Sequence, residues 1–438
     1  MKRHSLLKAF AAVSVLAVVA AACAKSTTTG GSSTPTGSAD CASASGCVTV
    51  APGDPIEIGT LLAISGATKS LGLDSQHGVV LAVDYLDGKF DGIPGTIDGH
   101  AVTLVNVDDG CSAEGGQTGA TTLAADPKMV GVIGSSCSSA SLGVADKILS
   151  AKYITTISPS ATNPALTESG THQPYWFRTA HNDRIQAAVV SDYAVQKLKA
   201  KTAVTIHDES PYTQGLTDAF KADFEAAGGT VTDEEAINSG DTDFKSLLTK
   251  IAQNPPDVIY APDFNAACGT MVKQKAGVSG LSKVAWMTSD GCSDSTFPTL
   301  AGSAGNGVYF SGPDLSSFAN GNFYKSQFLP AYESQFGTKP ISVFHAHAFD
   351  AFNMMAKAIE ASAVKNSDGS LTISRLALKN AVESTSNYKG IIGTLTCTPL
   401  GDCATSVTIA VYIYPNASFV DPNATPVFSE TKTLAQVK

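Results

Sequence analysis

The sequence predicts an α/β protein with two lobes, each a mostly parallel sheet with helices on both faces. Short apolar runs rich in β-branched residues alternate with segments of helical spacing, a pattern typical of parallel sheets. The chain has 438 residues, more than one domain usually contains. Breaks in the alternation near residues 178–180, 311–313 and 389–390 predict three crossings between the lobes, which would permit hinge closure.

The start of the chain has the pattern of an export signal. Three basic residues precede an apolar run, 9–22, that is short for a bilayer span and ends in alanines before Cys23. The alanines fit an ordinary cleavage site for secretion, and Cys23 alternatively fits the acylated first residue of a lipoprotein. The Ser/Thr/Gly tract 25–45 favours the lipoprotein because it is typical of a flexible tether. We expect a signal peptide over 1–22 and a lipidated tether over 23–54.

The cysteine count agrees with export. There are nine cysteines, so removal of Cys23 leaves an even number, as expected for disulfides in an exported chain. Other pairings and free buried thiols stay open, and no C-x₂-C spacing with a nearby His predicts a metal site. Nearest-neighbour pairing would join Cys41 with Cys47, Cys111 with Cys137, Cys268 with Cys292, and Cys397 with Cys403.

The charge of the chain limits its partners. The formal net charge is −10, and charged residues make up only 16% of the sequence. This composition argues against nucleic acid or an anionic membrane surface as a partner. It suits a large α/β protein with an extensive core.

The elements follow in a regular order. Strands are expected over 56–62, 102–107, 130–134, 153–157, 203–206, 258–260 and 284–287 because these runs are short, apolar and bounded by turn formers. Helices are expected over 75–86, 113–125, 140–151, 185–198, 213–227, 244–253, 344–364 and 373–382. A hairpin is expected over 390–414, with its turn at residues 399–402.

Two small hydroxyl-rich patches mark the candidate site. The strand at 130–134 runs into Ser135–Ser139, and the strand ending at Ile157 runs into Ser158–Thr162. A helix between the two strands places both patches at the carboxyl edge of one sheet, where open α/β folds bind ligands. Hydroxyls and free backbone N–H groups suit a carboxylate or another small anion.

The order and spacing of five motifs make the chain recognisable between Ile56 and Tyr414. The motifs are 58–66 (IGTLLAISG), 108–111 (DDGC), 134–139 (GSSCSS), 157–164 (ISPSATNP) and 207–215 (HDESPYTQG), followed by the acid and glycine at 290–291. With these, the chain resembles the solute-binding proteins of ABC transporters for branched-chain amino acids. That family has the type I periplasmic-binding-protein fold with two lobes, and its half-cystines match Cys111 and Cys137.

The resemblance implies a role for each residue of the site. Ser138 and Thr162 would bind the ligand carboxylate, Asp290 would pair with the ammonium, and Tyr212 would close over the ligand. Backbone groups around Ser139, Ser160 and Ala161 would assist, and Leu71 and Phe264 stand where tyrosines often contact the ligand side chain. Without the two tyrosine hydroxyls, the predicted pocket for the ligand side chain is more apolar or has a different shape.

The same chemistry follows from the residues alone. A free amino acid needs donors for its carboxylate and a carboxylate for its ammonium, in a closed and dry cleft. The alternatives are structural: Asp290 as a loop residue that accepts from backbone N–H groups, Tyr212 as a surface aromatic, and Ser138 as a helix N-cap.

An enzyme is not expected, and no cofactor is predicted. No G-x-G-x-x-G follows a strand and no G-x-S-x-G is present. His345 and His347 are two apart on a predicted helix and so face different sides. His207 follows a strand without a nucleophile beside it.

The prediction is therefore an extracytoplasmic binding lipoprotein that delivers a small amino acid to the permease of an ABC transporter. We expect a monomer held at the membrane only by its lipid, with no nucleic acid partner. The first lobe is expected over 55–179 and 313–389, and the second over 180–312 and 390–438. A short amide, urea or an aromatic acid as ligand, or a role as a ligand-sensing receptor component, stays open.

Overall fold

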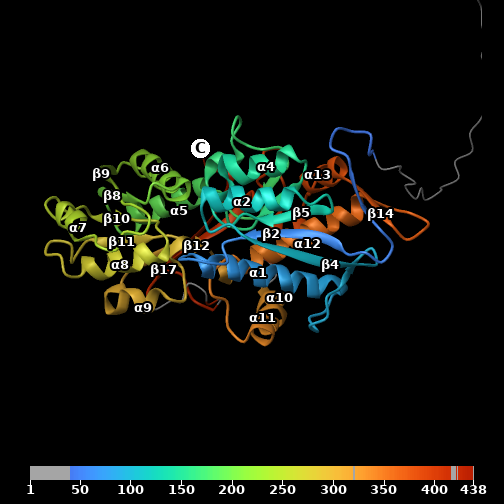
Figure 1. Ribbon diagram of the computed structural model, residues 1–438. Coiled ribbons are helices and arrows are strands. Elements are labelled where there is room, and N and C mark those ends of the chain that lie inside the picture. The colour runs from blue at the N-terminus through green and yellow to red at the C-terminus, as the bar shows by residue number, and fades with distance from the viewer. Residues whose placement is uncertain (1–39, 319–320, 416–420, 422, 438) are drawn as a thin grey trace, which may run out of the picture. The chain divides into compact units, whose positions relative to one another are not determined.

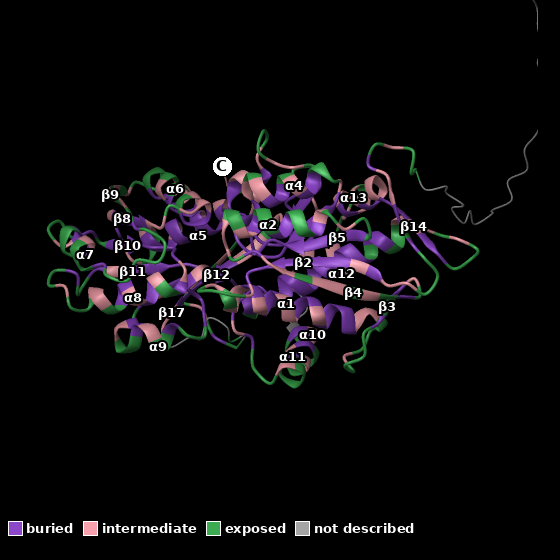
Figure 2. Ribbon diagram, in the orientation of Figure 1, coloured by how far each residue is buried: buried purple, intermediate pink, exposed green. Residues whose placement is uncertain are grey.

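Two separate sheets organise the protein (Figure 1). The structure is a computed structural model, and it describes residues 40–318, 321–415, 421 and 423–437. The predicted signal peptide and Cys23 lie outside the described residues. Most strand residues at the centre of each sheet are buried, as Figure 2 shows for β2 and β5.

The first sheet has six strands, and its central strands are parallel. Every residue of its strands β5 and β6 is buried, which explains why β5 is a continuous apolar run. In spatial order the strands are β3 (Thr96–Ile97), β4 (His100–Asp108), β2 (Ile56–Leu62), β5 (Met129–Gly134), β6 (Thr155–Ser158) and β7 (Trp176–Arg178).

Helices cover both faces of this sheet. One face carries α1 (Lys69–Asp84) and α12 (His345–Ser362), which pack together although they are distant in sequence (Figure 1). Their backbones approach so closely that a Cβ on Gly78 would collide with the carbonyl of His345. The other face carries α2 (Ala113–Ala124) and α4 (Asp146–Ala151).

The predicted helix over 140–151 is interrupted. The backbone of Leu142 and Gly143 is not helical, and Gly143 has a φ of +71°. Glycine adopts this left-handed conformation without steric cost, so it breaks the helix between α3 (Ser138–Ala140) and α4.

The second sheet has seven strands and also has helices on both faces. In spatial order they are β18 (Phe428–Thr433), β17 (Ser406–Ile413), β12 (Tyr309–Pro313), β11 (Ala285–Thr288), β10 (Val258–Tyr260), β8 (Thr202–His207) and β9 (Thr230–Ala236). Its helices are α5 (Asp183–Gln196), α6 (Pro211–Ala226), α7 (Lys245–Ile251), α8 (Asn265–Lys275) and α9 (Phe297–Ala301).

The predicted hairpin over 390–414 is wrong. Its second half, β17, pairs with β12 and β18, whereas its first half contains β16 (Thr394–Leu395), which pairs with β15 (Tyr388–Lys389). Ile391, Leu395 and Ala404 are buried in the core under the first sheet, and this burial holds the segment there. We therefore assign residues 390–404 to the first lobe, and the chain enters the second sheet only at β17.

Part of the range predicted as a tether, 23–54, is folded, and residues 23–39 lie outside the described residues. Cys47–Val50 forms strand β1, antiparallel to β14 (Leu371–Ser374), and Val48 and Val50 are buried. A third strand, β13 (Ala363–Lys365), pairs with the other edge of β14. Within the described residues, no helix is long and apolar enough to span a membrane. The remaining helices here are α10 (Gly321–Phe323), α11 (Leu329–Phe336) and α13 (Arg375–Glu383).

Candidate functional site

The two hydroxyl patches lie side by side, as predicted, because β5 and β6 are parallel neighbours with Ile133 opposite Ile157. Side chains of one patch bind the backbone of the other. The Ser158 hydroxyl donates to the Ser135 carbonyl (2.6 Å), and the Ser160 hydroxyl donates to the Ser136 carbonyl (2.8 Å). The two loops therefore form one rigid polar wall of the first lobe.

Ser138 joins the two loops by a hydrogen bond and can also contact a ligand. Its Oγ accepts from the backbone N–H of Asn163 at 3.1 Å, which leaves the hydroxyl proton free to donate. The side chain is buried and lines a cavity between the lobes. Ser138 starts α3, and no side-chain cap is formed there.

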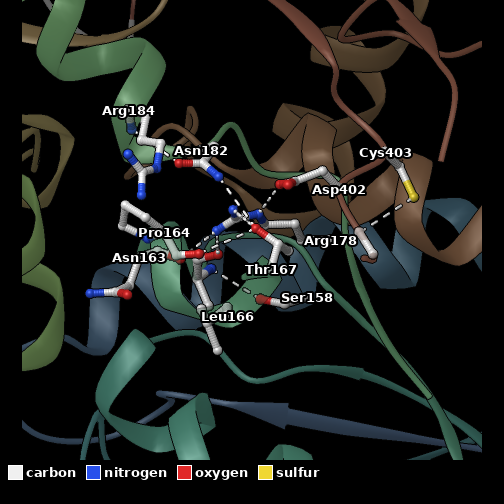
Figure 3. Close-up of polar contacts among 12 residues, drawn as sticks. Ser158, Asn163, Pro164, Leu166, Thr167, Arg178, Asn182, Arg184, Asp402 and Cys403 are labelled. Atoms are coloured by element: carbon white, nitrogen blue, oxygen red, sulfur yellow. Dashed lines mark hydrogen bonds and ion pairs between the residues drawn. The ribbon is translucent and has the colours of Figure 1, made fainter. Parts of the chain in front are cut away.

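A buried arginine holds the second loop from behind (Figure 3). Arg178 donates from Nη1 to the carbonyls of Ala161 (3.2 Å) and Asn163 (2.9 Å), and from Nη2 to the hydroxyl of Thr167 (2.8 Å). Its Nε is paired with Asp402. The loop after β6 is therefore fixed by a residue of the next strand.

The second lobe contributes an acid and a tyrosine. Asp290 follows β11, and Tyr212 lies in the first turn of α6 after the Ser210 N-cap. The Tyr212 hydroxyl lies 2.7 Å from the Ser289 Oγ and 3.4 Å from the Asp290 Oδ2. The other carboxylate oxygen of Asp290 has no hydrogen-bond partner among the described residues.

Burial and neighbouring charge make this acid unusual. Burial raises the pKa of Asp290, and His181, Gln186 and Tyr212 oppose that rise. Asp183 is equally buried, and burial together with the charge of Asp290 raises its pKa well above the ordinary value. Burial also lowers the pKa of His181, so this imidazole is neutral at neutral pH and does not balance the acids.

The predicted site residues do not all meet at one place. A cavity between the lobes is lined by six of them: Leu71, Ser138, Ser160, Tyr212, Phe264 and Asp290. Ser139, Ala161 and Thr162 do not line it. The Ser139 hydroxyl donates to the Cys111 carbonyl, Ala161 packs with Leu166 and Trp176, and the Thr162 carbonyl accepts from the Asp183 N–H.

Other residues line the cavity or face its acid without having been predicted as ligand contacts. Ser136, Gly291 and Phe344 line the cavity, and Asp183 acts on Asp290 from the start of α5. Ser136 lies in a predicted patch, and Asp183 follows the Asn182 N-cap directly after the first crossing, so both carried a weak signal. Phe344 is the residue before α12, and no feature of the sequence marked it as a site residue.

The cavity is nearly closed. Its volume is about 10 Å³, room for about one water molecule at most. Leu71, Phe264 and Phe344 form its apolar side. The lobes must therefore part, or these side chains must turn, before the cavity admits a small organic molecule.

All four predicted disulfides are present. They join Cys41 with Cys47, Cys111 with Cys137, Cys268 with Cys292, and Cys397 with Cys403. Two of them brace the site directly. Cys137 lies next to Ser138 and lines the cavity, and Cys292 ends the turn that begins with Asp290.

Two relatives of this chain are informative. An amino acid binding protein of Pseudomonas aeruginosa is 32% identical over 238 residues, which are 54% of this chain and 61% of that protein. The match thus spans less than two thirds of that relative. Leu/Ile/Val-binding protein homolog 3 of Brucella melitensis is 27% identical over 349 residues, which are 79% of this chain and 88% of the relative.

Solved structures share the fold. The branched-chain amino acid transporter substrate binding protein of Streptococcus pneumoniae, in complex with isoleucine, has a TM-score of 0.68 and 24% identity, covering 86% of this chain and 99% of that one. An ABC transporter solute binding protein of R. palustris, in complex with benzoate, has a TM-score of 0.70 and 22% identity, covering 87% of this chain and 96% of that one.

The sequence profile of a family described as periplasmic binding protein matches residues 55–408. That range includes both hydroxyl patches, Asp290 and most of both sheets. The two lobes with parallel sheets and the cavity between them agree with this match. The chain belongs to the periplasmic binding protein family.

Proposed function

We propose that this protein is the extracytoplasmic binding component of an ABC transporter and captures an apolar amino acid between its lobes. The lobes close over the zwitterion, and the loaded protein delivers it to the permease in the membrane. The protein acts as a monomer and performs no catalysis.

One observation carries the proposal: Asp290, whose buried Oδ1 has no hydrogen-bond partner among the described residues, lines the same cavity as Ser138 and Ser160 of the first lobe. An ammonium would supply a counter-charge to Asp290, because burial lowers the pKa of the neighbouring His181 and keeps that imidazole neutral. A carboxylate would accept from the Ser138 hydroxyl at the opposite wall. Both ends of a zwitterion thus find charge-assisted partners in a dry site.

The apolar side of the cavity supports an apolar ligand side chain. Leu71, Phe264 and Phe344 offer no hydroxyl or amide to a polar group. Leaving a polar ligand group unpaired there would cost free energy, whereas aliphatic surface gains about 25 cal/mol per Å² on burial. The names of two relatives, an amino acid binding protein and a Leu/Ile/Val-binding protein homolog, agree with this choice.

The test begins with a thermal-shift and calorimetric screen of leucine, isoleucine, valine and their analogues that lack the amine or the carboxylate. We expect the amino acids to bind and both kinds of analogue to bind weakly. Asp290→Ala should lose roughly 2–5 kcal/mol of binding free energy, because the ligand ammonium would be buried without its partner. Ser138→Ala should lose about 1–3 kcal/mol.

A matched control lies in the same lobe. Asp263 is also a buried carboxyl that has no hydrogen-bond partner in the part of the chain that the structure describes, but it does not line the cavity. Asp263→Asn should leave the affinity for the amino acid unchanged. Wild-type affinity in Asp290→Ala would rule out an ammonium at this site.

An aromatic acid is the second candidate ligand. Phe264 and Phe344 would suit an aromatic ring, and the related R. palustris protein is in complex with benzoate. A ligand without an amine leaves Asp290 unpaired, so this candidate predicts that Asp290→Ala binds benzoate at least as tightly as wild type. A short amide and urea are added to the screen, and binding of either would indicate the remaining transport alternative.

Membrane attachment through Cys23 is part of the proposal. It rests on the sequence: the short apolar run ends at Cys23, and a Ser/Thr/Gly tract follows. Mass spectrometry of the native N-terminus should find Cys23 as the first residue with a lipid attached. An unmodified N-terminus would indicate that the protein is secreted without a lipid anchor.

A further inference from the structure

A fully buried acid lies behind the apolar side of the cavity. Asp74 belongs to α1 and follows Leu71, which lines the cavity, by three residues. Residues at this spacing are neighbours on the surface of a helix. Segment 341–345, which leads into α12, carries Phe344 to the same cavity. Asp74 therefore lies where it can connect the two elements that supply Leu71 and Phe344.

Both oxygens of Asp74 hold segment 341–345. The Oδ1 accepts from the backbone N–H of Ile341 at 3.1 Å, and the Oδ2 accepts from the backbone N–H of His345 at 3.0 Å. These two N–H groups lie on either side of Phe344 in the chain. The acid thus fixes the segment at both of its ends.

Side chains complete the hydrogen bonds of Asp74. The Tyr332 hydroxyl donates to Oδ1 at 2.9 Å, and the Nδ1 of His345 lies 2.8 Å from Oδ2. Because a carboxylate only accepts, this Nδ1 carries the proton, and the Nε2 of the same ring lies 2.6 Å from the Tyr324 hydroxyl. Each oxygen of Asp74 therefore accepts from one backbone group and one side chain.

The ring of Phe344 is also held in place. Its centroid lies 6.2 Å from that of His181, with the two rings at 16° to each other, and 5.0 Å from that of His347. Segment 341–345 reaches the second lobe as well, because the Ile341 carbonyl accepts from the Ser295 N–H at 3.3 Å. With its backbone and its ring both held, Phe344 forms a firm part of the cavity wall.

We propose that Asp74 is a positioning residue for ligand selectivity: it holds segment 341–345 so that Phe344 and Leu71 form a fixed apolar wall for the ligand side chain. The part that concerns the ligand rests on the proposed function, whereas the effect of Asp74 on Phe344 does not. A role in stability alone would change the free energy of unfolding and leave both the place of Phe344 and the choice between ligands unchanged.

Asp74→Asn is the sharpest variant because it keeps the shape of the side chain. In either orientation its amide nitrogen faces one of the two backbone N–H groups, which can only donate, so one end of the segment is released. Tyr332→Phe is the matched control, since it removes a donor from the same acid and leaves both N–H groups bound. If Asp74→Asn does not fold, His345→Phe replaces it, because this variant keeps a ring against Tyr324 and Phe328 and loses the bond from Nδ1.

The first experiment follows Phe344 in the ligand-free protein by fluorine NMR. Phenylalanine is labelled with fluorine, and the signal lost in Phe344→Leu identifies the residue. In Asp74→Asn this signal should broaden or split, because the ring samples more than one environment. In Tyr332→Phe, which adds one signal of its own, the Phe344 signal should stay as in wild type. An unchanged Phe344 signal in Asp74→Asn would overturn the proposal.

The second experiment measures the affinities of alanine and leucine by calorimetry. Leucine buries more apolar surface than alanine, so it should bind wild type about 50-fold more tightly. In Asp74→Asn this ratio should fall by about fivefold or more, because the apolar wall yields while Ser138 and Asp290 still hold the zwitterion. His345→Phe should lower the ratio in the same direction, and Tyr332→Phe should keep it.

The two experiments separate the possible failures. An equal loss of affinity for alanine and leucine in Asp74→Asn would contradict a role in selectivity. If wild type binds no amino acid, the proposed function fails, while the fluorine signal of Phe344 still decides whether Asp74 positions that ring.

Discussion

The Nε of Arg178 lies 2.6 Å from the Oδ1 of Asp402, and both side chains are buried. Arg178 ends β7 in the first sheet, whereas Asp402 lies in the segment that leads to β17 in the second. The same guanidinium holds the carbonyls of Ala161 and Asn163 beside the cavity. One ion pair thus links the loop of the candidate site to the last crossing between the sheets.

Removing the arginine should destabilise the protein strongly. Arg178→Met leaves Asp402 buried without its cation and removes one donor from each of three buried acceptors, so we expect a loss of about 3–5 kcal/mol in the free energy of unfolding. Urea denaturation measures this loss. Lys128→Met is the control, because its 3.4 Å ion pair with Asp54 is exposed and should contribute less than about 1 kcal/mol. Equal losses in both variants would contradict the prediction.

The polar wall of the site could be predicted from the sequence because each of its loops is close in sequence to the strand that positions it. Each hydroxyl patch comes directly after its own strand, and parallel neighbours bring such loops together. The disulfides also followed, since each joins cysteines that are nearest neighbours in sequence. These features need no knowledge of how distant segments pack.

The missed features depend on distant packing. Phe344 reaches the cavity only because α12 packs on α1, and Asp74 meets His345 across a long stretch of sequence. The prediction also places the third crossing between the lobes too early, at residues 389–390, because residues 390–404 still pack on the first lobe. Only a few buried side chains hold residues 390–404 to the first lobe. In the sequence, their pattern resembles that of a strand pair, which is why it predicted a hairpin.

Asp350 should make stability depend on pH. This buried residue of α12 accepts from the backbone N–H groups of Ile391 and Ile392, each at 3.0 Å. Burial nevertheless raises its pKa to about 7. An aspartate in the unfolded chain titrates near pH 4, so between about pH 4 and pH 7 the native state holds a proton that the unfolded chain has released.

Stability should therefore fall as pH rises through that range, by up to about 1.4 kcal/mol per pH unit for this group. Asp109 has the same sign, since burial raises its pKa to about 7. Urea denaturation of wild type and Asp350→Asn at several pH values measures the dependence. The free energy of unfolding of Asp350→Asn should depend less on pH, and the stability of this variant relative to wild type should increase above pH 7. Parallel profiles would exclude a contribution from Asp350.

Gly215 should control how closely the lobes meet. It lies in α6 of the second lobe, and a Cβ there would collide with the side-chain amide of Asn163 in the first lobe. That amide donates to the carbonyl of Pro211, at the start of the same helix. A side chain at position 215 would therefore oppose this contact between the lobes.

Gly215→Ala separates stability from binding. Alanine in a helix interior is worth about 1 kcal/mol more than glycine, so the variant should unfold at equal or higher denaturant concentration. Its clash with Asn163 should weaken ligand binding by about tenfold, since overpacking costs roughly 1–3 kcal/mol. Asn163→Ala removes the clashing amide, so Gly215→Ala should cost little affinity in that background. Calorimetry on the two single variants and the double variant measures this coupling, and additive losses would show that Gly215 and Asn163 do not limit closure.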